Sequence, residues 1–283
     1  MVKSLVLENI SVGFKLPQGV FYAVDDVSLN LHGGNFTAII GESGCGKSVL
    51  GQAILNILPS GVVKKGRVLY NGEQVKKILS AFGIIPQNPS ESLNPVRKIG
   101  KQMQDILAVH NITDGDNSYK KQCLRLFGLQ EAERVLAAYP HELSGGMLQR
   151  VLCAMAVSSK PEWILADEPT KGLDEQVGAV VRKNLLTIKQ DLRLSMLIIT
   201  HDIALAQEVC DDVLVMYAGQ VLEHNADIWH KPLHPYTKGF LQALPKNGLQ
   251  VIPGKAPVPG ESFTGCKFAA RCPYCTTRCK EEM

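Results

Sequence analysis

The fold is decided by one short stretch near the amino terminus, Gly41-Glu42-Ser43-Gly44-Cys45-Gly46-Lys47-Ser48. The apolar run Phe36 to Ile40 precedes it, and the apolar helical pattern Val49 to Leu58 follows it. Glycines let successive backbone N–H groups turn toward one anion, and a helix N-terminus adds partial positive charge. In this context the stretch predicts a phosphate-binding loop, rather than a glycine-rich turn that contains a lysine by chance.

The residues of this loop have separate predicted roles. Lys47 is expected to reach the outer phosphates, and the Ser48 hydroxyl is expected to ligate magnesium. Cys45 contacts phosphate through its backbone N–H, while its thiol, close to a helix N-terminus, is predicted to have a lowered pKa and to react with alkylating agents. The other predicted nucleotide contacts in this segment are Gly41, Ser43, Gly44, Gly46 and Val49.

Two further apolar runs are followed directly by polar and charged residues. Ile164 to Ala166 precedes the paired acids Asp167 and Glu168, and Met196 to Ile199 precedes Thr200, His201 and Asp202. This layout is typical of a parallel α/β sheet, which binds ligands at the carboxyl ends of its strands. Beside a phosphate loop, Asp167 is predicted to bind magnesium and Glu168 to accept a proton from the attacking water; seen alone, the pair reads as an acidic turn.

Composition sets limits on the class of protein. The chain has 283 residues, 45% of them hydrophobic, and a formal net charge of +3. Acidic and basic residues are mixed along the sequence, which argues against electrostatic capture of nucleic acid. No apolar run is long enough to cross a bilayer, and residues 1–10 lack the continuous apolar stretch of a signal peptide, so we expect a cytoplasmic protein.

The organisation changes twice along the chain. Arg67 to Glu73 reads as a hairpin around Asn71-Gly72, which indicates an antiparallel piece beside the main sheet. Residues 88–159 lose the strand signal and show helical spacing in Ile99 to Val109 and Tyr119 to Leu129, which predicts an inserted helical subdomain. After residue 225, repeated prolines break the chain into short segments. We therefore expect domains at 1–225 and 226–283.

Four further motifs stand in a familiar order: Gln87 in Ile85-Pro86-Gln87-Asn88, then Leu143-Ser144-Gly145-Gly146, then Gly172-Leu173-Asp174, and finally His201. With the loop and the acid pair, they resemble the ATP-binding cassette (ABC) ATPases over essentially the whole chain. Taken singly, each motif also has a purely structural explanation: Gln87 as a loop amide, Ser144 as a helix cap and His201 as a hydrogen-bonded histidine at a strand end. Met147 and Cys45 depart from the commonest residues of the family, and neither departure removes a predicted contact.

The resemblance implies a fold and a set of roles. The fold is an α/β P-loop NTPase (RecA-like) core with an antiparallel β subdomain, the helical insertion and a small irregular carboxyl-terminal module. Gln87 contacts magnesium and water, and His201 contacts the γ-phosphate. Ser144, Gly145 and Gly146 contact the nucleotide of a second subunit, and Asp174 lies at the subunit interface. Adenine stacks on Phe14, if Lys15 to Phe21 is an inserted loop, or on Tyr22; ordinary packing is the alternative for both.

The carboxyl-terminal tail indicates which branch of the family the chain resembles. Leu233 to Thr237 and Ser92 to Pro95 resemble segments of the oligopeptide, dipeptide and nickel importers. Some of these importers hold a 4Fe–4S cluster in a cysteine tail, and this chain has four candidate ligands: Cys266, Cys272, Cys275 and Cys279. Four thiolates are enough to ligate such a cluster. In relatives the fourth ligand often lies farther downstream, and here Cys275 takes its place. Zinc and free thiols remain the alternatives.

The resemblance thus implies a subunit that binds and hydrolyses ATP with Mg²⁺ and energises an importer of peptides, nickel or nickel chelates. Its expected partners are a second ABC ATPase, with a heterodimer favoured over a homodimer, two transmembrane permease subunits and, indirectly, an extracytoplasmic substrate-binding protein. Its expected location is the cytoplasmic face of the cell membrane. The alternative is a soluble ABC ATPase that acts as a clamp in repair, translation or metallocluster assembly.

Overall fold

The computed structural model describes residues 4–17, 19–74, 78–244, 247–258, 261 and 263–281. These residues form two compact units. The first unit draws on residues 1–32, 37–76 and 210–283, and the second on residues 33–36 and 77–209. Among the described residues, no helix combines the length and the apolar character needed to span a membrane.

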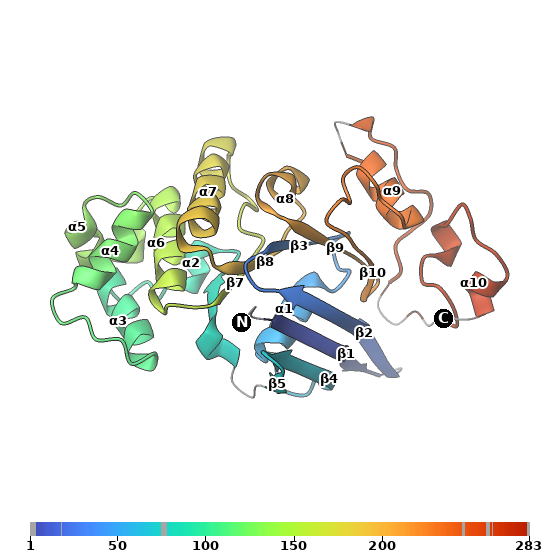
Figure 1. Cartoon of the computed structure of the whole chain (residues 1–283), viewed down its shortest axis with the longest axis horizontal. Helices are drawn as coiled ribbons and strands as arrows, with labels where there is room; N and C mark the ends of the chain where they lie inside the picture. Colours follow the sequence, from blue (N-terminus) through green and yellow to red (C-terminus); the bar gives the residue numbers. More distant parts are fainter. Residues whose placement is uncertain are drawn as a thin grey trace. The chain divides into compact units, whose positions relative to one another are not determined.

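The first unit contains an antiparallel sheet in the order β2-β1-β4-β5 (Figure 1). Its strands are β1 (Ser4–Leu16), β2 (Gly19–His32), β4 (Val63–Tyr70) and β5 (Glu73–Gln74). Buried apolar residues recur at every second position over part of β1 and β2, which gives the sheet one core face. The turn between β4 and β5 is the predicted hairpin, because Asn71 and Gly72 both adopt positive φ angles.

The same unit holds the predicted strand–loop–helix segment. Residues 37–40 of β3 (Phe36–Ile40) pair in parallel with β9 (Asp212–Tyr217), and β9 pairs antiparallel with β10 (Gln220–His224). All five residues of β3 are buried, as expected for a central strand. The loop then leads into α1 (Lys47–Leu55), so the expected strand and helix flank the opening motif, although the helix ends at Leu55 rather than Leu58.

The carboxyl-terminal part of the first unit is short and irregular. It contains α9 (Pro235–Gln242), a 3₁₀ turn at Ala269–Arg271 and α10 (Arg278–Glu281). Tyr236 and Phe268 are fully or almost fully buried, with their rings 5.5 Å apart. Both rings also pack against Tyr217 of β9, at 4.6 and 5.3 Å. This aromatic cluster attaches the tail to the core strands.

In the second unit, the strands β6 (Phe82–Ile85), β7 (Trp163–Asp167) and β8 (Ser195–Ile199) form a parallel ladder. The covering helices include α7 (Glu175–Thr187), which continues into a π-helical turn at Ile188–Leu192, and α8 (Ile203–Val209). A 3₁₀ turn at Ile78–Ala81 leads into β6. Parallel strands buried on both faces account for the continuous apolar runs seen in the sequence.

The predicted helical region is confirmed in the same unit. It comprises α2 (Pro89–Ser92), α3 (Ile99–Val109), α4 (Ser118–Leu126), α5 (Ala132–Ala137), a 3₁₀ turn at Pro140–Glu142 and α6 (Gly145–Ser158). In Figure 1, α3 to α6 lie together in green to yellow-green. Ile99, Met103 and Leu107 of α3 are fully buried, which is the i, i+4, i+8 stripe of an amphipathic helix.

Other segments also differ from what was considered. Residues 15–21, which were to be an inserted loop if adenine stacks on Phe14, are mostly strand, because Lys15 pairs with Val20 and Leu16 with Gly19. Helix α4 ends at Leu126 rather than Leu129. Gly128 has a φ of 76° and donates to the carbonyl of Arg125, and Leu129 N–H bonds back to Leu124. This is the glycine-based helix stop, which closes the last turn early.

Candidate active site

The phosphate loop is held against neighbouring backbone in the first unit. Gly46 precedes α1 with a φ of 104°, and a Cβ at this position would lie 2.1 Å from the carbonyl oxygen of Ala23. Gly219 N–H donates to the carbonyl of Cys45 at 2.9 Å. Only glycine satisfies both the positive φ and the close approach at position 46, so the loop follows a path that other residues would block.

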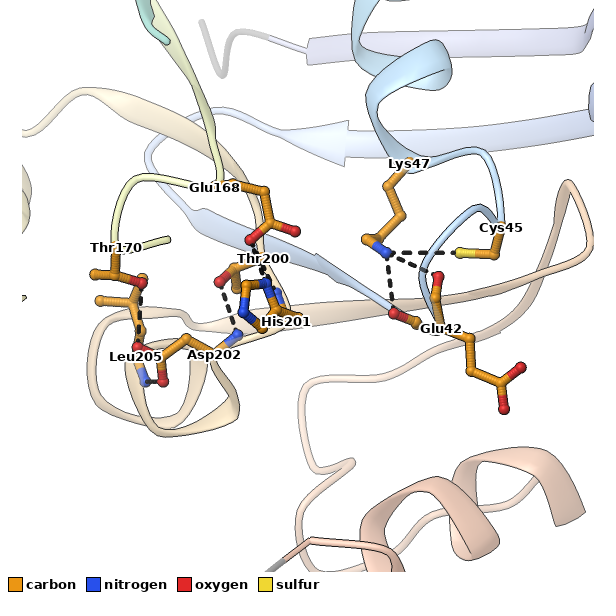
Figure 2. Close-up of polar contacts among 10 residues, drawn as sticks. Glu42, Cys45, Lys47, Glu168, Thr170, Thr200, His201, Asp202 and Leu205 are labelled. Carbon is orange, nitrogen blue, oxygen red and sulfur yellow. Dashed lines mark hydrogen bonds and ion pairs between the residues drawn. The ribbon is translucent and has the colours of Figure 1, made fainter. Parts of the chain in front are cut away.

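Lys47 lies inside this loop. Lys47 is only 7% exposed, and its Nζ donates to the carbonyls of Gly41 and Glu42 at 2.9 and 3.0 Å. Figure 2 shows the ammonium directed back at the loop backbone, with the carboxylate of Glu42 pointing away from it. A buried cation held by carbonyl dipoles, rather than by a carboxylate, keeps its charge available for an anionic ligand.

The thiol prediction for Cys45 is wrong. The residue is 6% exposed, and burial raises the pKa of its thiol above the usual value, although the Lys47 ammonium opposes this effect. Desolvation penalises the thiolate more than the nearby cation favours it. Cys45 is therefore expected to be slow toward alkylating agents.

The carboxyl edge of the parallel strands gathers the predicted catalytic residues of the second unit. Ile85 of β6 pairs with Ala166 of β7, which in turn pairs with Ile198 of β8. Gln87 and Glu168 each follow their paired residue by two positions, and His201 follows Ile198 by three. Strand register therefore brings one amide, one carboxylate and one imidazole to the same edge.

Glu168 is fixed tightly at this edge. Its φ of 47° lies in the left-handed region, which costs a non-glycine residue about 1–3 kcal/mol. Its N–H donates to the carbonyl of Ile199 at 2.8 Å, and its Oε2 lies 2.6 Å from Nδ1 of His201. Figure 2 shows the side chains of Glu168 and His201 directed toward each other. The side chain of Glu168 is 12% exposed and that of His201 is 56% exposed. Asp167, the last residue of β7, retains ordinary strand pairing, so the two acids leave the strand end differently.

The predicted magnesium ligands have suitable chemistry. The Ser48 hydroxyl, the Asp167 carboxylate and the Gln87 amide supply the hard oxygen donors that Mg²⁺ prefers. Ser48 belongs to the first unit at the start of α1, whereas Gln87 and Asp167 follow or end strands of the second unit. Each of the three side chains thus carries a donor suited to Mg²⁺, and their joint role stays a prediction.

The signature segment presents a helix start. Ser144 is the N-cap of α6, and its Oγ accepts the Met147 N–H at 3.3 Å. Ser144 and Gly145 are exposed, and nothing lies within 4 Å of a Cβ placed on Gly145. Asp174 caps α7 in the same way, with its Oδ1 accepting the Val177 N–H at 3.0 Å. Both side chains thus have a capping role on surfaces that remain accessible.

The two adenine candidates lie on neighbouring strands of the first sheet. Phe14 pairs with Phe21, and Gly13 pairs with Tyr22. Because adjacent register positions alternate between faces, Phe14 and Tyr22 occupy opposite faces of the sheet. One ligand can therefore stack on only one of them, and the choice stays a prediction.

Several residues of the site were not expected from the sequence. The phosphate loop is contacted by Tyr236, whose hydroxyl accepts the Glu42 N–H at 3.1 Å, and by Arg271, whose guanidinium pairs with the Glu42 carboxylate. In the second unit, buried Gln149 of α6 donates to the carbonyl of Pro169, next to Glu168. The residues beside Tyr236, Arg271 and Gln149 in the sequence carry no signal for these contacts.

The expected metal cluster in the tail is not formed by this arrangement. Within the described part of the chain, no three His, Cys, Asp or Glu side chains are placed to hold a metal ion. Thr276 takes up two of the four thiols: Cys275 Sγ donates to its carbonyl at 3.5 Å, and Cys279 Sγ lies 3.3 Å from its hydroxyl. The positions of Cys266, Cys272, Cys275 and Cys279 therefore do not fit a 4Fe–4S or zinc site.

Known proteins match the chain over nearly all of its length. Residues 24–171 match the family described as ABC transporter, and residues 222–279 match the oligopeptide/dipeptide transporter, C-terminal region. The oligopeptide transport ATP-binding protein OppD of Haemophilus influenzae is 35% identical over 98% of this chain and 91% of its own length. The dipeptide transport ATP-binding protein DppD of Escherichia coli is 37% identical over 98% of this chain and 91% of its own length.

Solved structures agree on the fold. The cbiO1 protein of Clostridium perfringens, part of the ABC transporter complex cbiONQ, has a TM-score of 0.65 and 26% identity, covering 79% of this chain and 88% of its own. The cassette MJ0796, in a dimeric post-hydrolysis state bound to ADP and Pi, has a TM-score of 0.64 and 25% identity, covering 78% and 97%. The predicted P-loop NTPase fold is thereby confirmed. The chain belongs to the ABC transporter family, as an ATPase that carries the oligopeptide/dipeptide transporter C-terminal region.

Proposed function

We propose that this chain is the ATP-hydrolysing subunit of an importer of oligopeptides or dipeptides, working at the cytoplasmic face of the membrane. The relatives named for oligopeptide and dipeptide transport align with it along nearly their whole length. The observation that carries hydrolysis is the contact between Glu168 and His201 at the carboxyl edge of the parallel strands. A fixed carboxylate beside an imidazole is suited to taking a proton from water.

The residues divide the work as follows. The loop backbone and Lys47 bind the phosphates, and Ser48, Gln87 and Asp167 would hold a magnesium ion, which would neutralise phosphate charge. Glu168 orients the attacking water and accepts its proton. His201 fixes the Glu168 carboxylate through Nδ1, and we assign the contact with the γ-phosphate to its exposed ring. Positioning and charge stabilisation of this kind account for most of the catalysis in phosphoryl transfer.

We infer that the complete site needs two cassettes. Ser144 and Gly145 offer an exposed helix start, which is an anion site that this subunit supplies to its partner's nucleotide. The solved cassette bound to ADP and Pi is described as dimeric, which supports this pairing. Because peptide and nickel importers typically use two different ATPases, we favour a heterodimer, with two permease subunits and an extracytoplasmic binding protein completing the importer.

Peptides are preferred over the other cargoes and roles. The relatives compared above are named for peptides, whereas no contact of the described residues favours nickel, a nickel chelate or a soluble clamp. The 4Fe–4S cluster has no part in this proposal. Purification of the importer with its permease subunits and binding protein, followed by identification of the bound ligand, tests the cargo: a peptide supports the proposal, and nickel or the lack of any permease contradicts it.

The test of the mechanism is Glu168→Gln, which keeps the shape of the side chain and removes the base. We expect MgATP affinity to stay within a few-fold and hydrolysis to fall by about a hundred- to ten-thousand-fold. Equilibrium binding of ATP and release of phosphate measure the two effects. Glu175→Gln, at an exposed carboxylate in the first turn of α7, is the control and should leave both unchanged. Turnover by Glu168→Gln near the wild-type rate removes Glu168 from this role.

A further inference from the structure

The carboxyl-terminal module of the first unit contacts the phosphate loop through an ion pair. Two guanidinium nitrogens of Arg271 each lie 3.0 Å from one carboxylate oxygen of Glu42. The Arg271 side chain is only 6% exposed, and its Nε also donates to the carbonyl of Pro253 at 3.1 Å. Such a two-point contact fixes the direction of both side chains, which a single contact to a lysine would not do.

A second contact holds the backbone of the same residue. The hydroxyl of Tyr236 accepts the N–H of Glu42 at 3.1 Å, and Tyr236 itself is fully buried. The ring packs against Tyr217, Phe268 and Phe240, at 4.6, 5.5 and 5.8 Å. Glu42 is therefore held at its main chain by one residue of the tail and at its side chain by another.

These contacts act on the residue next to Gly41, at the point where the loop leaves β3. The carbonyl of Glu42 is also one of the two carbonyl acceptors of the Lys47 ammonium, whose Nζ lies 3.8 Å from Cys45 Sγ as well. Rotation of the peptide that joins Glu42 to Ser43 would thus misplace both the Ser43 N–H, a predicted phosphate contact, and one carbonyl partner of Lys47. A glycine-rich loop has many alternative conformations, so an external anchor raises the fraction of molecules whose loop is ready to bind.

A third contact joins the same tail segment to the strand beside the loop. Lys267 Nζ lies 2.6 Å from the Asp25 carboxylate and donates to the carbonyl of Ala218 at 2.9 Å. Ala218 is followed by Gly219, whose N–H holds the carbonyl of Cys45. The segment from Lys267 to Arg271 therefore meets the surroundings of the loop at two separate places.

We propose that Arg271 and Tyr236 are positioning residues for nucleotide binding, which hold the phosphate loop in its binding conformation through Glu42. The proposal rests on the ATP-binding function proposed above and adds that the peptide-transporter region takes part in it. Neither residue needs to touch the nucleotide. Loss of either contact lowers the fraction of competent loops, and the apparent affinity for ATP falls by the same factor.

The experiment measures the ATP dissociation constant and the melting temperature of the full-length chain for Tyr236→Phe, Arg271→Ala, Glu42→Gln and the double variant Glu42→Gln/Arg271→Ala. We expect Tyr236→Phe to weaken ATP binding about threefold to tenfold and Arg271→Ala about tenfold or more. Binding is measured well below each melting temperature, so that a loss of fold does not imitate a loss of affinity. The double variant should bind no more weakly than Arg271→Ala alone, because both changes break one contact.

Matched controls change similar contacts elsewhere. Tyr119→Phe removes a hydroxyl that bonds to the Ser158 carbonyl, and Arg134→Ala breaks an exposed ion pair with Glu131. Both should leave ATP affinity unchanged.

The proposal is overturned if Tyr236→Phe and Arg271→Ala bind ATP as the wild type does, or if their only effect is a lower melting temperature. If Arg271→Ala does not fold, Arg271→Lys and Tyr236→Phe decide the matter. Wild-type protein that binds no ATP defeats this inference and the proposed function together, whereas tight wild-type binding with unaffected variants defeats this inference alone.

Discussion

The Nδ1 atom of His201 lies 2.6 Å from Oε2 of Glu168, and the same oxygen is 3.3 Å from the His201 backbone nitrogen, which donates to it. Two groups of one residue thus fix one carboxylate oxygen, while the backbone of Glu168 is itself held in the left-handed region. The carboxylate and the imidazole therefore behave as one unit, and a change in either should affect hydrolysis more than binding.

Replacement of the imidazole tests this coupling. His201→Ala should reduce the rate of phosphate release by about a hundredfold, because Glu168 loses its orienting partner. ATP affinity should change only a few-fold, since the loop around Lys47 is unaltered. Single-turnover hydrolysis and equilibrium binding measure the two quantities. His230→Ala, at an exposed histidine paired with Asp227, is the control. Equal losses of binding and of rate would show that His201 acts on nucleotide affinity instead.

The phosphate loop offers a comparison of two glycines. Gly44 and Gly46 both have positive φ angles, but only Gly46 would bring a Cβ against backbone, at 2.1 Å from Ala23 O. Gly44→Ala should lower the free energy of unfolding by about 1 kcal/mol, the cost of the backbone conformation alone. Gly46→Ala should cost clearly more, about 2 kcal/mol or above, and should weaken ATP binding. Urea unfolding measures the difference; similar values for the two variants would contradict the steric explanation.

The thiols differ in predicted reactivity. Cys279 is partly exposed, and the hydrogen bonds from Thr276 hold its thiol pKa below the usual value. Burial raises the pKa of Cys45 and raises that of Cys153 to about 12. At about pH 7.5, iodoacetamide should therefore modify Cys279 at least about tenfold faster than Cys45, with Cys153 slowest. Mass spectrometry of peptides over time measures the rates, and comparable rates at Cys45 and Cys279 would be inconsistent with the burial described.

His234 makes the stability of the tail dependent on pH. Its Nδ1 accepts the Tyr236 N–H at 3.0 Å at the start of α9, and burial lowers the pKa of the imidazole despite the nearby Glu223. The unfolded chain then binds a proton more readily than the folded chain. Stability is complete above the unfolded pKa of about 6.5 and falls as the pH drops below it toward the folded pKa. His234→Asn keeps a capping oxygen without titrating. Urea unfolding between about pH 7.5 and 5.5 should give a smaller slope for this variant, and equal slopes would contradict the assignment.

Much of the fold follows from local signals. The strand Phe36–Ile40 and the helix Ile99–Val109 have the predicted bounds, because an apolar run before a glycine loop and a clean helical stripe are unambiguous. The position of Glu168 and His201 at the carboxyl ends of parallel strands also follows, since each comes directly after an apolar run of strand length. In these cases each residue carries its own signal within a few positions.

The wrong predictions concern properties that are determined by residues distant in the sequence. The reactivity of Cys45 depends on burial by segments far along the chain, and local reasoning saw only the helix start beside it. The cysteine tail has enough thiols for a metal site but does not arrange them around a metal, because hydrogen bonds to Thr276 set the direction of two thiols. The inserted loop considered after Phe14 is mostly strand, since pairing with β2 continues to Gly19. Tyr236 and Arg271 contact Glu42 across 194 and 229 positions, a separation that no local pattern encodes.

That last separation has a consequence for how the protein is made. Glu42 leaves the ribosome 229 residues before Arg271 does. At about 5–20 residues per second, the nascent chain spends roughly ten to fifty seconds with this partner still to be synthesised. A newly made chain acquires its fully anchored phosphate loop only after Arg271 has been synthesised, so premature ATP capture by shorter nascent chains is disfavoured by the order of the sequence itself.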